Sequence, residues 1–456
     1  MDEHLRMSPA STSPAVGLRE AFLYWLELGF IGFGGPAGQI AMMHQELVER
    51  RRWISERRFL HALDYCMLLP GPEATQLAVY IGWMMHRTWG GIVAGALFVL
   101  PSVFILIALT WIYMAYGNLP AVAGILYGIK PAVTAIVVFA AYRIGSRALK
   151  NGLLWAMAAA AFIAIFAFDV PFPAIVLSAA ILGYLGGQIA PEMFKSGGGH
   201  GAADKSYGPA LIDDHTPAPP WVRFSWGRLT AYSAAGLALW GGVMALLMAQ
   251  GGWEGVLTQM GWFFTKAALL TFGGAYAVLP YVYQGGVEHY GWLTGAQMID
   301  GLALGETTPG PLIMVVAFVG FLGGWVKQIF GPEALAWAGV AGGFVAAFFT
   351  FLPSFLFILI GAPLVEATHG DIRFTSPLTG VTAAVVGVVA NLALFFAWHV
   401  LWPQGTPALP FAGRFEWFPA LIGLAAGVAL FRYRIGILPV IGACALVGLA
   451  RALAAG

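Results

Sequence analysis

The chain has 456 residues, of which 59% are hydrophobic and only 10% charged, and its mean hydropathy is +0.78. This composition excludes a soluble globular protein, and a formal net charge of +1 gives no indication of a nucleic-acid partner. Many stretches reach the ~20 apolar residues that are needed to cross a bilayer. The sequence therefore predicts an all-α polytopic integral membrane protein with the lipid bilayer around it.

Apolar segments follow a polar N-terminal tail, residues 1–17, which lacks the pattern of a cleaved signal peptide. A second polar stretch, residues 191–228, contains "KSGGGHGAADKS" and "DDHTPAPP", and its Gly, Pro and charge predict a flexible linker. Thirteen segments are predicted, at 18–40, 63–86, 91–116, 121–142, 152–168, 172–190, 229–249, 256–280, 298–325, 335–362, 378–401, 416–431 and 434–453.

The two sides of the linker carry related sequences. "FGGPAGQI" at 33–40 aligns with "FGGAYAVL" at 272–279 at an offset of 239 (272 − 33). The same offset places "PGP" at 70–72 on "PGP" at 309–311. Further along, "LPS" at 100 matches "LPS" at 352, an offset of 252 (352 − 100), so one insertion of 13 residues (252 − 239) reconciles both alignments. The sequence therefore predicts a duplication.

The duplication divides the chain into a first membrane repeat, 18–190, and a second repeat, 250–456. Segment 229–249 is left over as an extra helix that makes the second repeat enter the membrane from the opposite side. Such inverted repeats are typical of secondary transporters. The distribution of Lys and Arg over the loops predicts a cytoplasmic N-terminus and linker and a periplasmic C-terminus.

One loop conflicts with a simple count of crossings. "ERRRWISERR" at 49–58 carries five arginines, whereas the equivalent loop at 288–297 has neither Lys nor Arg. The first loop is cytoplasmic if the segments that contain FGGP and PGP dip into the membrane and return. Irregular backbone at membrane depth is tolerated where protein or a cavity surrounds it. We therefore expect nine full spans and four re-entrant elements, with thirteen full spans as the alternative.

The breaks suggest an anion site. A helix that restarts after Gly and Pro exposes unpaired N–H groups at its positive end, which attracts anions. In oppositely facing repeats these ends can converge on one anion, whereas the alternative is that PGP only kinks a packed helix. The candidate substrate-binding residues are Gly34, Gly35, Pro36, Gln39, Pro70, Gly71, Pro72, Gln76, Lys266, Gly273, Gly274, Pro309, Gly310 and Pro311.

Charged residues inside apolar segments are the second indication. Glu27, Glu73 and Glu306 are candidates for proton coupling or charge pairing, and the repeat offset aligns Glu27 with Lys266. Asp300 begins its segment, so we expect it near the membrane interface, where charged side chains reach water. The nine histidines show no metal-ligand spacing, and no phosphate-binding loop is present. We therefore predict a non-enzymatic protein without a metal or cofactor.

Residues 33–102, from "FGGPAGQI" to "FVLPS", resemble the N-terminal domain of the chromate transporter (CHR) family. "LLTFGGAYAVLPYVYQ" and "GETTPGPLIMVVAFVG" resemble its second domain, as in the long, two-domain form of the family. The resemblance implies an inner-membrane exporter of chromate, a dianion similar to sulfate, that confers chromate resistance. Glu27 stands where the family often has Lys, which leaves Lys266 as the candidate cation.

The resemblance and the breaks together predict a secondary transporter that works by alternating access at an anion site built by both repeats. Sulfate or another oxyanion could use the same geometry, and an anion channel would keep the same breaks. A homodimer is compatible with the sequence, which does not fix the oligomeric state.

Overall fold

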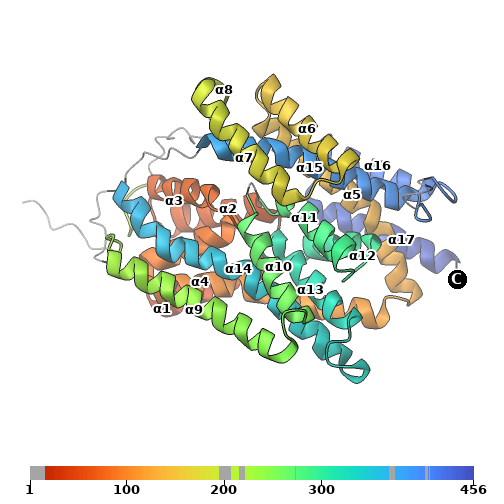
Figure 1. Cartoon of the computed structure of the whole chain (residues 1–456), viewed down its shortest axis with the longest axis horizontal. Coiled ribbons are helices and arrows are strands. Elements are labelled where there is room, and N and C mark those ends of the chain that lie inside the picture. Colours follow the sequence, from red (N-terminus) through yellow and green to blue (C-terminus); the bar gives the residue numbers. More distant parts are fainter. Residues whose placement is uncertain are drawn as a thin grey trace, which may run out of the picture.

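The computed structural model describes residues 16–194, 207–214, 221–272, 274–368, 375–405, 409 and 411–455 (Figure 1). Its helices are α1 Leu18–Ile31, α2 Gly35–His44, α3 Glu56–Leu68, α4 Glu73–Tyr116, α5 Pro120–Ala148, α6 Gly152–Phe168, α7 Phe172–Ile189, α8 Pro191–Phe194, α9 Trp226–Gly251, α10 Val256–Leu269, α11 Ala275–Tyr283, α12 Gly295–Thr307, α13 Val315–Val326, α14 Leu335–Thr368, α15 Thr375–Leu401, α16 Trp417–Phe431 and α17 Ile437–Ala455. Short π-helical turns lie at Gln45–Arg50 and Gln284–His289, and short 3₁₀ turns at Leu312–Met314 and Pro332–Ala334.

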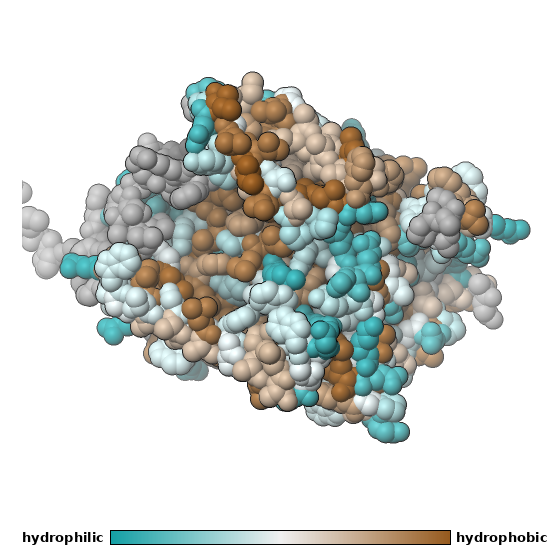
Figure 2. Space-filling view, viewed as in Figure 1, coloured by the Kyte–Doolittle hydropathy of each residue, from teal (hydrophilic) through white to brown (hydrophobic). Residues whose placement is uncertain are grey.

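Within the described ranges every regular element is helical, and the only bridge between extended residues joins Ile54 and Ile212. Seven helices are long and apolar enough to cross a membrane, namely α4, α5, α7, α9, α14, α15 and α17, and three shorter apolar helices are α6, α16 and Leu312–Val326, which contains α13. Large apolar side chains are exposed on α6 and α7, where Figure 2 shows a hydrophobic surface. The protein is therefore a multi-pass helical membrane protein, as predicted, and the number of crossings stays a prediction.

Local structure repeats at the sequence offset. The two π-helical turns begin at Gln45 and Gln284, which differ by 239 (284 − 45). α3 and α12 are capped at equivalent positions, since the side chain of Ser55 accepts from the N–H of Arg58 and that of Thr294 from the N–H of Gln297. Side-chain capping of this kind satisfies N–H groups that the first helical turn leaves unpaired.

α4 consists of two helical pieces. The backbone is non-helical at His86 and Arg87, where Arg87 has a φ of 59°. The piece before this turn folds back against the piece after it, because a Cβ added to Gly82 would meet the carbonyl of Gly90. α13 and α14 repeat this arrangement, with Gly320 against Gly342. In both halves the piece that follows PGP is therefore the first arm of a helical hairpin.

In the first half, both broken elements begin and end at the linker end of the molecule. The guanidinium of Arg51, at the end of α2 and its π turn, lies 3.3 Å from the carboxylate of Glu20 at the start of α1. The hydroxyl of Ser55, just before α3, donates to Asp214 of the linker at 2.7 Å. Where the helical piece after PGP ends, a ring nitrogen of His86 lies 2.9 Å from the carbonyl of Val16, just before α1.

In the second half, the broken elements begin and end at the other end of the molecule. α9 starts beside the turn in α4, where Thr88 and Tyr232 share a hydrogen bond of 2.7 Å, and runs away from it. The residues after it lead directly into α10, and the ring of Tyr290 packs 5.7 Å from that of Phe263 in α10. Figure 1 shows α1–α3 at the left and α12 toward the right. The broken elements of the two halves therefore lie toward opposite ends of the molecule, and the opposite orientation of the two repeats in the membrane stays a prediction.

Several predicted segments fall partly outside the described residues. These are residues 1–15 of the N-terminal tail, residues 195–206 and 215–220 of the linker, and Gly273 of the second FGG motif.

Candidate functional site

Each PGP break lies against the FGG break of the other half. The N–H of Gly310 donates to the carbonyl of Gly32 at 2.8 Å, and the N–H of Gly71 donates to the carbonyl of Thr271 at 2.7 Å. Positions 32 and 271 differ by 239 (271 − 32), as do 71 and 310, so the two bonds are equivalent under the repeat. Motifs predicted separately in each half therefore meet across the interface between the halves.

Serines of the two LPS motifs complete these junctions. The hydroxyl of Ser102 donates to the carbonyl of Pro309 at 2.5 Å. A Cβ on Gly310 would collide with the hydroxyl of Ser102, and a Cβ on Gly71 would collide with that of Ser354. Both glycines also have positive φ, 96° and 123°, which L side chains rarely adopt. Glycine is thus required at both tips by backbone conformation and by space.

The two predicted glutamines donate hydrogen bonds to backbone carbonyls at the breaks. The side-chain amide of Gln39 donates to the carbonyl of Gly32 at 2.8 Å and to that of Gly310. The amide of Gln76 donates to the carbonyl of Pro70 at 2.8 Å. Both side chains are fully buried. In this conformation their N–H groups hold backbone carbonyls, and their role as substrate ligands stays a prediction.

Helix starts follow all four breaks. α2 begins after Gly34 and α11 after Gly274, with φ of 90° and 101°. A Cβ on Gly35 or Gly274 would meet nothing within 4 Å, so space is open beside both starts. Gly34 is exposed and Gly35 and Pro36 are partly exposed, whereas the second PGP, 309–311, is buried. The FGG breaks therefore supply accessible helix starts, and the PGP breaks supply the buried contacts that hold them.

The predicted acidic residues have different surroundings. Glu73 is the first residue of α4, so its carboxylate lies at the positive end of that helix, where it competes with any other anion. Glu306, in the last turn of α12, is buried and accepts a hydrogen bond from the hydroxyl of Tyr276. Tyr276 is the second residue of α11, two positions after Gly274 of the second FGG, so this bond also joins two breaks. Glu27 is exposed on α1.

Lys266 lies in the last turn of α10, directly before the second FGG break. Its ammonium is 5.6 Å from the centre of the Trp262 ring, a cation–π contact. Among the described residues, no ion pair includes Lys266 or Glu27. The pairing of these two residues stays a prediction.

Four residues at the junctions are missing from the predicted set. Thr271, Ser102, Ser354 and Tyr276 all contact a break. The matched LPS motifs were a usable signal for the serines, since both motifs recur at the repeat offset. The expectation that the side chain of Asp300 reaches water is wrong, because Asp300 is buried and pairs with Lys130 at 3.3 Å, whereas its place near the membrane interface stays a prediction.

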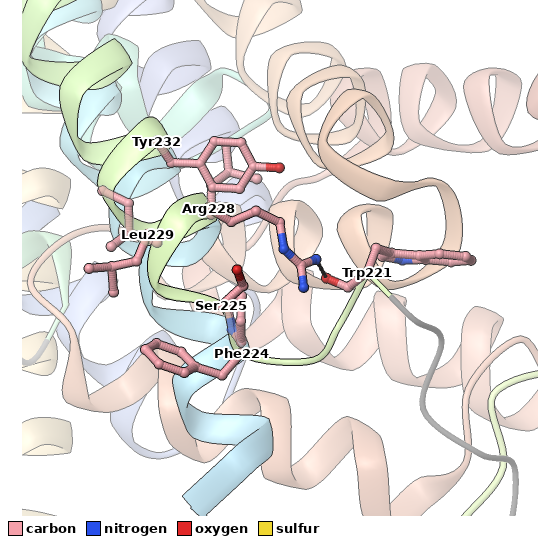
Figure 3. A pocket seen from close by; sticks show the side chains of 9 residues that line it. Trp221, Phe224, Ser225, Arg228, Leu229 and Tyr232 are labelled. Atoms are coloured by element: carbon pink, nitrogen blue, oxygen red, sulfur yellow. Dashed lines mark hydrogen bonds between the residues drawn. The ribbon is translucent and has the colours of Figure 1, made fainter.

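A small pocket at the start of α9 lies apart from these junctions. Figure 3 shows Arg228 turned toward Trp221, whose carbonyl accepts from its guanidinium at 2.5 Å. The pocket is lined by residues of α9, of the end of the linker and of α14, and none of the break residues contributes to it.

The family model described as chromate transporter matches residues 19–184 and 258–449, one match in each half. The chain belongs to the chromate transporter family. A chromate transport protein of Cupriavidus metallidurans is 32% identical over 387 residues, covering 85% of this chain and 84% of that protein. A probable chromate transport protein of Synechococcus elongatus is 30% identical over 379 residues, covering 83% of this chain and 84% of that protein. No solved structure matches this family member.

Proposed function

We propose that this protein is a secondary transporter that exports chromate from the cytoplasm across the bacterial inner membrane and thereby confers chromate resistance. The observation that carries the proposal is the pair of equivalent bonds that joins Gly310 to Gly32 and Gly71 to Thr271. A site built from the breaks of two oppositely facing halves can open toward either side as one half moves against the other. Family membership supplies the class of substrate, a tetrahedral oxyanion.

The anion is proposed to bind at the helix starts that follow the FGG breaks, with Lys266 as the nearby cation and both PGP tips as support. Gly34, Gly35 and Gly274 would approach the oxyanion with their backbone, since helix N-termini bind anions without a positively charged side chain, and Pro36, which has no N–H, would shape the start of α2 beside it. Glu73 and Glu306 would hold protons or occupy the anion position when the site is empty. Neither an enzymatic reaction nor a cofactor is part of this proposal.

The proposed orientation in the membrane rests on the distribution of Lys and Arg over the loops. The arginine-rich loop 49–58 contacts the linker through the bond between Ser55 and Asp214. Because cytoplasmic loops carry an excess of Lys and Arg, we propose that this end faces the cytoplasm and the C-terminus faces the periplasm. Nine full spans with four re-entrant elements then account for every described apolar helix, in two repeats, 18–190 and 250–456, with residues 229–249 inverting the second.

Membrane potential suffices to drive this export. Each charge moved gains ~2.3 kcal/mol per 100 mV, so a dianion that leaves a negative-inside cell gains about 4.6 kcal/mol. This free energy supports a concentration ratio above about a thousandfold. Coupling to protons is therefore not required by thermodynamics, although Glu73 and Glu306 could carry them.

Chromate uptake into everted membrane vesicles tests the proposal. We expect saturable uptake that falls when the membrane potential is collapsed and that sulfate inhibits if the site accepts both dianions. Uptake that does not saturate and shows no counter-flow would favour an anion channel. Saturable uptake of sulfate without uptake of chromate would identify a sulfate transporter, and uptake of neither anion contradicts the proposal.

A further inference from the structure

An ion pair between a partly exposed lysine and a buried aspartate joins the two halves away from the helix breaks. The ammonium of Lys130, on α5, lies 3.3 Å from Oδ2 of Asp300, on α12. The hydroxyl of Tyr113, on α4, donates to the same oxygen at 3.0 Å. Lys130 and Tyr113 precede the linker, whereas Asp300 follows it. The pair therefore ties the second half's PGP element to the first half.

The cost of burying the Asp300 carboxylate is not fully offset by hydrogen bonds. The Asp300 side chain is only 4% exposed, and its second oxygen, Oδ1, is buried and without a hydrogen-bond partner among the described residues. A buried polar atom that lacks a partner is costly, and a buried ion pair rarely stabilises a fold when its lone pairs are not all satisfied. A purely structural role would be served as well by two apolar side chains. Retaining these charges therefore points to a use for them.

The two partners differ in accessibility. Lys130 is 30% exposed, so its ammonium can meet a second ligand while Asp300 stays enclosed. An ammonium has three N–H donors, and Asp300 uses one oxygen to accept from it. A carboxylate and a tetrahedral oxyanion offer the same kind of acceptor to a lysine. Asp300 can thus be exchanged for an incoming anion without any covalent step.

The pair lies at one end of the molecule. Asp300 is in the second turn of α12, which starts at the end opposite the linker and leads to the PGP tip at Pro309. The ring of Tyr113 packs 5.5 Å from that of Phe318, in the helix that follows this tip. Under the repeat offsets, Lys130 aligns with Thr382 (130 + 252) and Asp300 with His61 (300 − 239). No equivalent pair of charges is therefore encoded for the linker end.

We propose that Lys130 is a second station for the transported oxyanion, between the PGP break at Pro309 and the end of the molecule opposite the linker. Asp300 pairs with the ammonium of Lys130 when no anion is present. When an anion has replaced Asp300 at this ammonium, Asp300 keeps its hydrogen bond from Tyr113. The ligand class is a tetrahedral divalent oxyanion such as chromate or sulfate. This inference rests on the proposed function.

Three variants separate a ligand from a structural pair, namely Lys130→Met, Asp300→Asn and the double variant. The readouts are equilibrium binding of labelled chromate and of labelled sulfate to the purified protein, and chromate uptake into everted vesicles. We expect Lys130→Met to weaken binding at this second station and to lower uptake, each by about tenfold or more, while binding at the FGG breaks remains, and the double variant to be equally defective. Asp300→Asn should bind at least as tightly as the unchanged protein, because the internal competitor is gone.

A double variant with binding and uptake within about twofold of the unchanged protein would overturn the inference, since a neutral pair would then suffice. Lys130→Arg keeps the charge and should retain binding, which excludes misfolding at this position as the cause of the loss. Failure of the proposed function is recognised separately, because the unchanged protein would then show no chromate uptake. Loss of binding in Asp300→Asn equal to that in Lys130→Met would also overturn the inference.

Discussion

The hydroxyl of Ser102 donates a hydrogen bond to the carbonyl of Pro309, yet its repeat equivalent, Ser354, has no hydrogen-bond partner among the described residues. Both serines are completely buried and both lie against the glycine of a PGP tip. The junctions are therefore equivalent in position and different in bonding. Such a difference is expected if one conformation of an alternating-access cycle is present, with the two bonding patterns exchanged in the other.

Ser102→Ala should slow chromate uptake about tenfold, because it leaves the buried carbonyl of Pro309 without a donor, at a cost of about 1–3 kcal/mol. Ser354→Ala should also slow uptake, by removing the donor that the other conformation needs, with less effect on thermal stability. Ser146→Ala is the matched control, since that exposed serine donates to the carbonyl of Arg143 on its own helix. Uptake at the control rate in both variants would contradict a role for these serines.

Alanine at Gly71 or Gly310 should abolish transport while the protein remains in the membrane. The added Cβ would collide with Ser354 or Ser102, and the positive φ would cost a further ~1–2 kcal/mol. Gly242→Ala in α9 is the control, because a Cβ there meets nothing within 4 Å. Membrane abundance and initial uptake are measured together. Normal uptake by both tip variants would exclude the PGP tips from the transport mechanism.

The hydrogen bond from Tyr276 to Glu306 predicts coupled effects of two substitutions. Tyr276→Phe and Glu306→Gln should each reduce chromate uptake, and the double variant should be little worse than the more defective single variant. Residues that share one buried interaction usually couple by about 0.5–3 kcal/mol in a double-mutant cycle. The uptake rates of the four proteins give this coupling directly, and strictly additive effects would mean that the bond has no part in transport.

The elements that the sequence predicted correctly are those with a strong local signal. Long apolar runs located the helices, and FGG and PGP located all four breaks, because Gly and Pro interrupt a helix wherever they occur. The offset between "FGGPAGQI" and "FGGAYAVL" also matches the equivalent caps that the structure shows at Ser55 and Thr294. These features depend on residues that are close together in the chain.

The contacts between the halves could not be predicted from local sequence patterns. Pairing of Gly310 with Gly32 depends on how two repeats pack, and no local pattern encodes that choice. The burial of Asp300 was not predicted, because its position at the start of an apolar segment suggested a side chain that reaches water. Its partner Lys130 comes from another helix of the other half, and only the packed structure brings the two charges within 3.3 Å.

Lys266→Ala should lower chromate uptake about tenfold or more, since a charged hydrogen bond to the anion would be lost. Lys266→Arg should keep part of the activity, because the positive charge and the contact with Trp262 can both persist. Lys327→Ala, at an exposed lysine beyond α13, is the control for a general effect of charge. If Lys266→Ala transports as well as this control, Lys266 is not a substrate ligand.

Labelling of single cysteines at equivalent positions decides between re-entrant and fully spanning segments. Cys66 and Cys444, which are both buried and free, are first replaced by Ala, and Ser55→Cys or Thr294→Cys is then introduced. Because Ser55 contacts Asp214 of the linker, Ser55→Cys should react with a membrane-impermeant maleimide only from the cytoplasmic side. Thr294→Cys, its repeat equivalent, should react only from the periplasmic side. If all thirteen segments span the membrane, Ser55→Cys should react only from the periplasmic side and Thr294→Cys only from the cytoplasmic side. Each cysteine therefore serves as the control for the other.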